Sequence, residues 1–172
     1  MQFRSCVTNP CLLHKERERP VFNPNDLSSI GTFNFAHSYM GAARALSSQL
    51  WSEHETHPDS PEEFLFWHSI ELFLKAFLLA DGMTEQVLRV RTYGHNIQSL
   101  YQEASRRGLR LTVKDTEVLS YMPDKDSMLE LRYLKFGVRT VPDLEEIEET
   151  CTNIYREVGA QLQQRGVAVR VY

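Results

Sequence analysis

Three ionisable side chains stand at helical spacing in the most apolar stretch of the chain. His68, Glu71 and Lys75 occupy positions i, i+3 and i+7 within residues 64–80, so on a helix they share one stripe. Burying ionisable groups costs several kcal/mol unless they find partners. The stripe therefore either lines a polar cleft or belongs to a buried network, in which Arg132 is a candidate partner for Glu71.

A second group of polar side chains directly precedes a predicted helix start at Asn96. His95 is the residue immediately before it, and Arg89, Arg91 and Tyr93 come earlier in the same loop. Because the start of a helix attracts anions, His95 with Arg89 and Arg91 could bind a phosphate group. The alternative is that His95 and Asn96 only organise the helix cap.

Metal chemistry has little support in the sequence. Cys6, Cys11 and His14 could supply three ligands, but a fourth is missing and their spacing matches no common zinc pattern. The order of His68 and Glu71 is the reverse of the Glu-x-x-His motif of di-metal helical bundles, and no second copy exists. We expect neither a metal nor a cofactor.

Composition excludes several classes of protein. The chain has 172 residues, of which 42% are apolar, enough for one domain with its own core. The net charge of −4 gives no overall basic field for tight, sequence-independent nucleic-acid binding. Residues 64–80 are too short and too charged to span a membrane, and no signal peptide is visible. We therefore expect a cytoplasmic protein. It also lacks phosphate-loop, dinucleotide and serine-elbow motifs.

Hydrophobic periodicity predicts an all-α, up-and-down bundle of about five helices. Residues 26–51 place apolar side chains three, four and seven positions apart. The next helix, 61–80, is apolar on nearly every side, which indicates the centre of the bundle. A third helix follows Asn96 and ends at Gly108, and a fourth follows a capping pair that starts at Thr112.

A last long helix begins at Pro142 and carries a narrow apolar seam. The seam repeats at 3.5-residue spacing and consists of Leu144, Ile147, Cys151, Ile154 and Val158. It could face the body of the bundle or a second copy of the chain, and the small residues within 26–51 could also form a dimer contact. We expect an extended N-terminal segment over 1–25, a helical domain over 26–165 and a short tail over 166–172.

Four blocks of the sequence resemble the HEPN domain family, a helical domain shared by higher eukaryotes and prokaryotes and linked to nucleotide binding. The resemblance covers about residues 30–160. The blocks are Tyr39-x2-Ala42-Ala43-x2-Leu46, His68-Ser69-Ile70-Glu71-Leu72-x2-Lys75-Ala76-x-Leu78-Leu79, Gly94-His95-Asn96-Ile97-x2-Leu100 and Leu131-Arg132-Tyr133.

The resemblance implies an all-helical bundle that usually forms a homodimer. It further implies a defence, toxin–antitoxin or RNA-processing setting, often with a nucleotidyltransferase-type partner protein. The positions that match the family are His68, Glu71, Lys75, His95, Arg132 and Tyr133. With Tyr93 and Arg91 of the neighbouring loop, they form the candidate ligand site.

One branch of this family consists of metal-independent ribonucleases with an Arg-x(4–6)-His motif late in the fold. Here no histidine follows His95, and the spacing is met only by Arg89 and His95, in an earlier loop. We therefore expect a non-catalytic dimeric module that binds nucleotide, RNA or a partner protein. The alternatives are an endoribonuclease that uses His95 with Arg132 or Arg89, and a purely structural interaction protein.

Overall fold

The computed structural model describes residues 28–48, 59–122 and 142–172. These residues form six α-helices and no strand, so the predicted all-α bundle is confirmed. No helix among them has the length and apolarity needed to cross a membrane. The helices are α1 (Ser29–Ser47), α2 (Asp59–Ala80), α3 (Glu85–Arg89), α4 (Ile97–Arg106), α5 (Val113–Ser120) and α7 (Leu144–Gln164).

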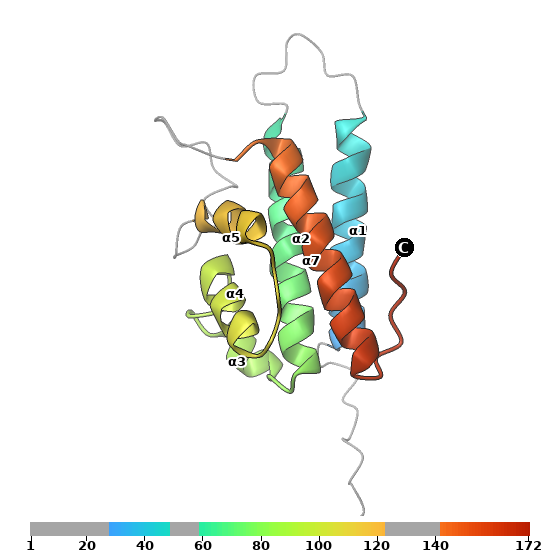
Figure 1. The fold of residues 1–172 in the computed structure, drawn as a ribbon, viewed down its shortest axis with the longest axis vertical. Helices are drawn as coiled ribbons and strands as arrows, with labels where there is room; N and C mark the ends of the chain where they lie inside the picture. Colours follow the sequence, from blue (N-terminus) through green and yellow to red (C-terminus); the bar gives the residue numbers. More distant parts are fainter. Residues whose placement is uncertain (1–27, 49–58, 123–141) are drawn as a thin grey trace, which may run out of the picture.

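The apolar helix α2 lies at the centre of the bundle, as its composition predicts. It packs against α1 and α7 on one side and against α4 on another (Figure 1). Ala36 and Ala43 of α1 are fully buried, and the hydroxyl of Ser69 donates a hydrogen bond of 2.8 Å to the carbonyl oxygen of Ala36. Small residues on α1 therefore let α1 and α2 approach each other closely.

The apolar seam of the last helix belongs to the core of the bundle. Ile147, Cys151, Ile154 and Val158 are each 0–1% exposed, and α7 packs against α2. Burial raises the pKa of the Cys151 thiol to about 12, so this cysteine is protonated and unreactive at neutral pH. Of the two positions considered for the seam, the body of the bundle is the correct one.

Three helices end at the same end of the bundle in the same conformation. Each is followed by a glycine with positive φ, namely Gly82 (88°), Gly108 (103°) and Gly166 (79°). The amide after each glycine bonds to a carbonyl five residues earlier, from Met83 to Leu78, from Leu109 to Ala104 and from Val167 to Leu162. This is the Schellman arrangement, and it confirms Gly108 as a helix terminator.

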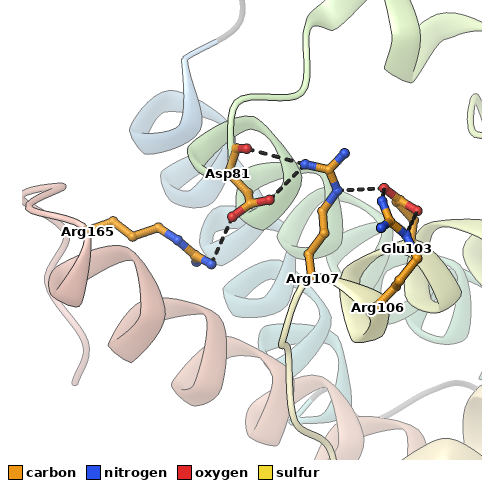
Figure 2. Close-up of polar contacts among 5 residues, drawn as sticks. All are labelled: Asp81, Glu103, Arg106, Arg107 and Arg165. Atoms are coloured by element: carbon orange, nitrogen blue, oxygen red, sulfur yellow. Dashed lines mark hydrogen bonds and ion pairs between the residues drawn. The ribbon is translucent and has the colours of Figure 1, made fainter.

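Charged side chains connect these three helix ends (Figure 2). Arg107 after α4 and Arg165 after α7 both donate to the carboxylate of Asp81, at 2.7 and 3.2 Å. Glu103 accepts from Arg106 and Arg107, and those hydrogen bonds lower its pKa to about 2. Cations at helix C-termini also offset the negative ends of the helix dipoles.

The C-terminal tail folds back over α7 and α1. The amide of Tyr172 donates to the hydroxyl of Tyr155 at 2.8 Å, and Val169 is buried. Gly159 of α7 makes room for this segment, because a Cβ placed there would lie 2.3 Å from Cγ2 of Val171.

Some predicted boundaries are wrong. α1 begins at Ser29, three residues after the expected start at 26, because the side chain of Ser28 caps it by accepting from the amide of Gly31. The expected end at 51 lies outside the described residues. α2 begins at Asp59, two residues before the expected Pro61. The helix α3 was not expected at all, so the described residues hold more helices than the predicted count. Thr84 caps α3 and the buried side chain of Leu88 anchors it. Five residues are too few for an apolar repeat to appear.

Candidate functional site

Four of the predicted site residues come together around one buried carboxylate. His68, Glu71 and Lys75 lie along α2, and the loop between α3 and α4 brings His95 to them. The carboxylate of Glu71 is at the centre, with its side chain only 1% exposed. The three side chains that helical spacing placed on one stripe therefore form one cluster in space, together with His95.

Both oxygens of Glu71 lie beside nitrogen atoms. Oε1 pairs with Nζ of Lys75 and lies 3.2 Å from Nδ1 of His95. Oε2 lies 3.6 Å from Nδ1 of His68, slightly longer than a hydrogen bond. Lys75 also donates to the carbonyl oxygen of Gly94. Because Gly94 and His95 belong to the loop, the carboxylate ties α2 to that loop.

The surroundings of Glu71 keep it ionised. Burial alone would raise the pKa of this carboxyl. The nearby His68 imidazole and the charge and hydrogen bond of Lys75 outweigh the burial, with a further contribution from His95, and hold the pKa below its usual value. The negative charge of Glu71 is thus balanced within the cluster by the ammonium group of Lys75.

Exposure increases from the centre of the cluster to its edge. The side chains of Lys75 and His68 are 14% and 18% exposed, and that of His95 is 44% exposed. The ring of His68 lies edge-on to Tyr39, with centroids 4.5 Å apart, and stacks on Phe64 at 5.8 Å. The cluster is therefore a buried ionic network that reaches the surface mainly at His95.

The cap interpretation of residues 95 and 96 is half correct. The side chain of Asn96 caps α4 by accepting from the amide of Ser99 at 2.9 Å. His95 does not serve only the cap, since its imidazole is directed to Glu71.

The remaining loop residues separate into three environments. Arg91 is exposed, and Tyr93 is partly buried against the core. Arg89 belongs to α3 rather than to a loop, is 74% exposed and forms an ion pair with Glu85. Arg91 and His95 are therefore the exposed basic side chains of this loop.

Residue types alone did not reveal every member of the cluster. Gly94 acts through its backbone carbonyl, which no side-chain pattern reports, although it stands beside His95 in the sequence. Tyr39 and Phe64 were expected only as parts of helices, and both contact His68. An aromatic residue four positions before a histidine on one helix is the signal that points to Phe64.

Several predicted residues lie outside the described part of the chain. They are Arg132, Tyr133, Cys6, Cys11 and His14, so their roles stay predictions. Within the described ranges, no group of three or more metal-ligating side chains is placed to hold an ion.

No family model matches the chain, and neither a curated protein nor a solved structure matches it. The carboxylate of Glu71 lies 3.2 Å from Nδ1 of His95, and a carboxylate beside one ring nitrogen orients an imidazole. Such an imidazole can contact an anion when protonated or transfer a proton.

Proposed function

We propose that this chain is a HEPN-like helical module that binds the phosphate groups of a nucleotide or RNA without catalysing a reaction. The observation that carries the proposal is the contact between the buried carboxylate of Glu71 and the imidazole of His95. It fixes a titratable ring at the surface of a loop that also exposes Arg91.

The charges around this loop favour an anionic ligand. Glu71 is neutralised by Lys75, so the cluster directs no net negative charge toward the loop. Arg91 is a charged donor on this loop, and the exposed imidazole of His95 adds a ring N–H donor beside it. Hydrogen bonds between charged donors and phosphate oxygens are among the stronger ones in proteins.

The arrangement favours binding over catalysis. Cleavage of a phosphodiester needs a group that moves protons and a cation that stabilises the added negative charge. Arg89 has the motif spacing to His95, but it is engaged by Glu85 on α3. His68 is largely enclosed by aromatic rings. The described residues thus supply an oriented imidazole with Arg91 nearby, but the arginine at the motif spacing pairs with Glu85.

A thermal-shift and filter-binding pair of experiments tests the ligand. We expect a short single-stranded RNA or a nucleoside phosphate to raise the melting temperature, and His95→Ala and Arg91→Ala to weaken filter binding about tenfold each. Arg170→Ala is the matched control, since this arginine is exposed on the tail. Absence of both stabilisation and RNA binding in the wild type, at low salt, contradicts the proposal.

A metal-independent endoribonuclease is the second candidate, and the geometry of His95 is what favours it. An imidazole held at Nδ1 by a carboxylate 3.2 Å away is the arrangement of a general base. This alternative expects cleavage that persists in excess chelator, falls in Glu71→Gln and is lost in His95→Ala. It also requires Arg132 or Arg89 as the cation.

We further propose that the module is a homodimer that contacts its copy through the outer face of α1. The seam of α7 is buried inside the bundle, which leaves α1 of the two helices considered. Phe35 is 56% exposed there, its ring edge-on to Tyr39 at 4.9 Å, and Gly41 and Ala42 are exposed on the same helix.

Sedimentation equilibrium tests the dimer. Ala42→Arg should produce a monomer, because a long charged side chain blocks close approach of two helices. Val113→Asp is the control, since Val113 is an exposed apolar residue on α5. A monomeric wild type contradicts the dimer.

The resemblance to the HEPN family also leads us to propose a nucleotidyltransferase-type partner protein in a defence or toxin–antitoxin setting. Co-purification of the two proteins tests this proposal.

A further inference from the structure

A cavity of about 270 Å³ lies beside the amino-terminal turn of α5, apart from the Glu71 cluster. Arg110 and Thr112 line it from the connection between α4 and α5. Asp115 lines it from α5, and Asn153 and Arg156 line it from α7. Residues from three segments of the chain thus meet at one concave surface.

The carboxylates at this cavity are already engaged. Asp115 is 1% exposed. Its Oδ2 accepts from the amide and the hydroxyl of Thr112, at 3.1 and 2.7 Å, and its Oδ1 accepts from the side-chain amide of Asn153 at 3.0 Å. Glu157 accepts from Gln161 at 3.1 Å. These hydrogen bonds fix the two carboxylates in the wall of the cavity.

The two arginines at the cavity, unlike the carboxylates, have no hydrogen-bond partner among the described residues. Arg110 and Arg156 are both exposed, and neither forms a hydrogen bond or ion pair with another described residue. By contrast, Arg44, Arg107 and Arg165 each bond a carboxylate elsewhere in the bundle. The cavity therefore combines a pre-formed polar wall with two guanidinium groups that are available to a ligand.

We propose that this cavity binds the terminal phosphate of a small phosphate monoester. A monoester carries a charge close to −2 at neutral pH, which matches two arginines, and guanidinium groups bind phosphate oxygens in pairs of hydrogen bonds. The volume is slightly below the range of about 300–1,000 Å³ typical of drug-sized ligand sites. The site thus suits a phosphate with a short organic group.

The surroundings disfavour an extended nucleic acid as the occupant. Each linking phosphate of RNA carries a single charge, and a strand following α7 meets Glu149 one turn before Asn153 and Glu157 directly after Arg156. A terminal phosphate held by the two arginines avoids Glu149, which does not line the cavity, while the carboxylate of Glu157 accepts from Gln161 in the cavity wall.

The test is an NMR titration of the full chain labelled with ¹⁵N, with glycerol 3-phosphate as the probe. We expect saturable shifts of the Thr112 amide and the Asn153 side-chain amide. Arg110→Ala and Arg156→Ala should each weaken the affinity about tenfold, while Arg170→Ala leaves it unchanged. Affinity should also fall several-fold between pH 7.5 and pH 5, because a monoester takes up a proton near pH 6.

Two further probes decide the class of ligand. Dimethyl phosphate, a singly charged diester, should bind at least several-fold more weakly than glycerol 3-phosphate. Equal affinity for the two, or tighter binding of a dinucleotide that has no terminal phosphate, overturns the proposal. Absence of saturable shifts at these two residues also overturns it. Unchanged melting temperatures of the arginine variants show that the fold is intact, as expected for exposed side chains without partners.

Discussion

Replacement of Glu71 by alanine is the perturbation that most clearly separates a buried network from an open cleft. The variant leaves the ammonium group of Lys75, which is 14% exposed, with only the carbonyl oxygen of Gly94. Removing one partner of a buried ion pair costs about 3–5 kcal/mol. Because Lys75 keeps one acceptor and some contact with water, we expect the lower end, about 3 kcal/mol.

Urea denaturation followed by circular dichroism measures this loss directly. The midpoint should fall with an unchanged m-value, and the melting temperature should fall by roughly 6–12 °C for a chain of this size. Glu149→Ala is the matched control. It removes a carboxylate that pairs with Lys114 while both side chains are more than half exposed, so it should cost less than about 1 kcal/mol.

A double variant removes both members of the ion pair between Glu71 and Lys75. Glu71→Leu with Lys75→Met removes both charges and keeps apolar volume, so its stability should exceed that of Glu71→Ala. A loss below about 1 kcal/mol in Glu71→Ala itself would refute the reasoning. It would show that water already solvates Lys75 and that the cluster lines an open cleft.

Three other perturbations test the rest of the bundle. Glu103→Gln should destabilise the protein at neutral pH, and its difference from the wild type in unfolding free energy should shrink between about pH 4.5 and pH 2. The reason is that a carboxyl with a pKa lowered to about 2 contributes stability above its unfolded pKa and loses it as it is protonated. Gly159→Ala should displace the tail at Val171 and cost about 1–3 kcal/mol by overpacking, seen as faster amide exchange at Tyr172 and a lower denaturation midpoint. Asp81→Ala should cost about 1–3 kcal/mol in chemical denaturation, because Arg165 loses its carboxylate partner and Arg107 keeps only Glu103.

Much of the fold was accessible from the sequence because local signals and the core pattern agree. Thr112 and Asp115 form the expected capping box. Asn96 begins a helix and Gly108 ends it, as their residue types predict. The apolar character of α2 placed it at the centre of the bundle. Such features depend on neighbours within a few residues, so pattern analysis finds them.

The candidate site was predicted only in part. The stripe of His68, Glu71 and Lys75 followed from helical periodicity, but the convergence of His95 depends on how a loop packs against α2. No spacing rule reports such a contact. Nor does periodicity reveal a backbone acceptor such as Gly94, or a helix as short as α3, whose cap and single buried leucine stabilise it.

The two cations at the α5 cavity show a similar limit. Arg110 and Arg156 lie 46 positions apart in the chain, and only the packing of α5 against α7 brings their segments to one surface. A sequence without an alignment holds no signal that pairs them.

The most direct test of the proposed function is one gel experiment with purified protein and a labelled single-stranded RNA in excess chelator. Bound, free and cleaved RNA are separated for the wild type, His95→Ala and Arg91→Ala. We expect the wild type to retard the RNA and leave it intact, and both variants to retard it more weakly. RNA that the wild type cleaves and His95→Ala leaves whole would contradict a non-catalytic module, and RNA that is neither bound nor cleaved would contradict the phosphate-binding role.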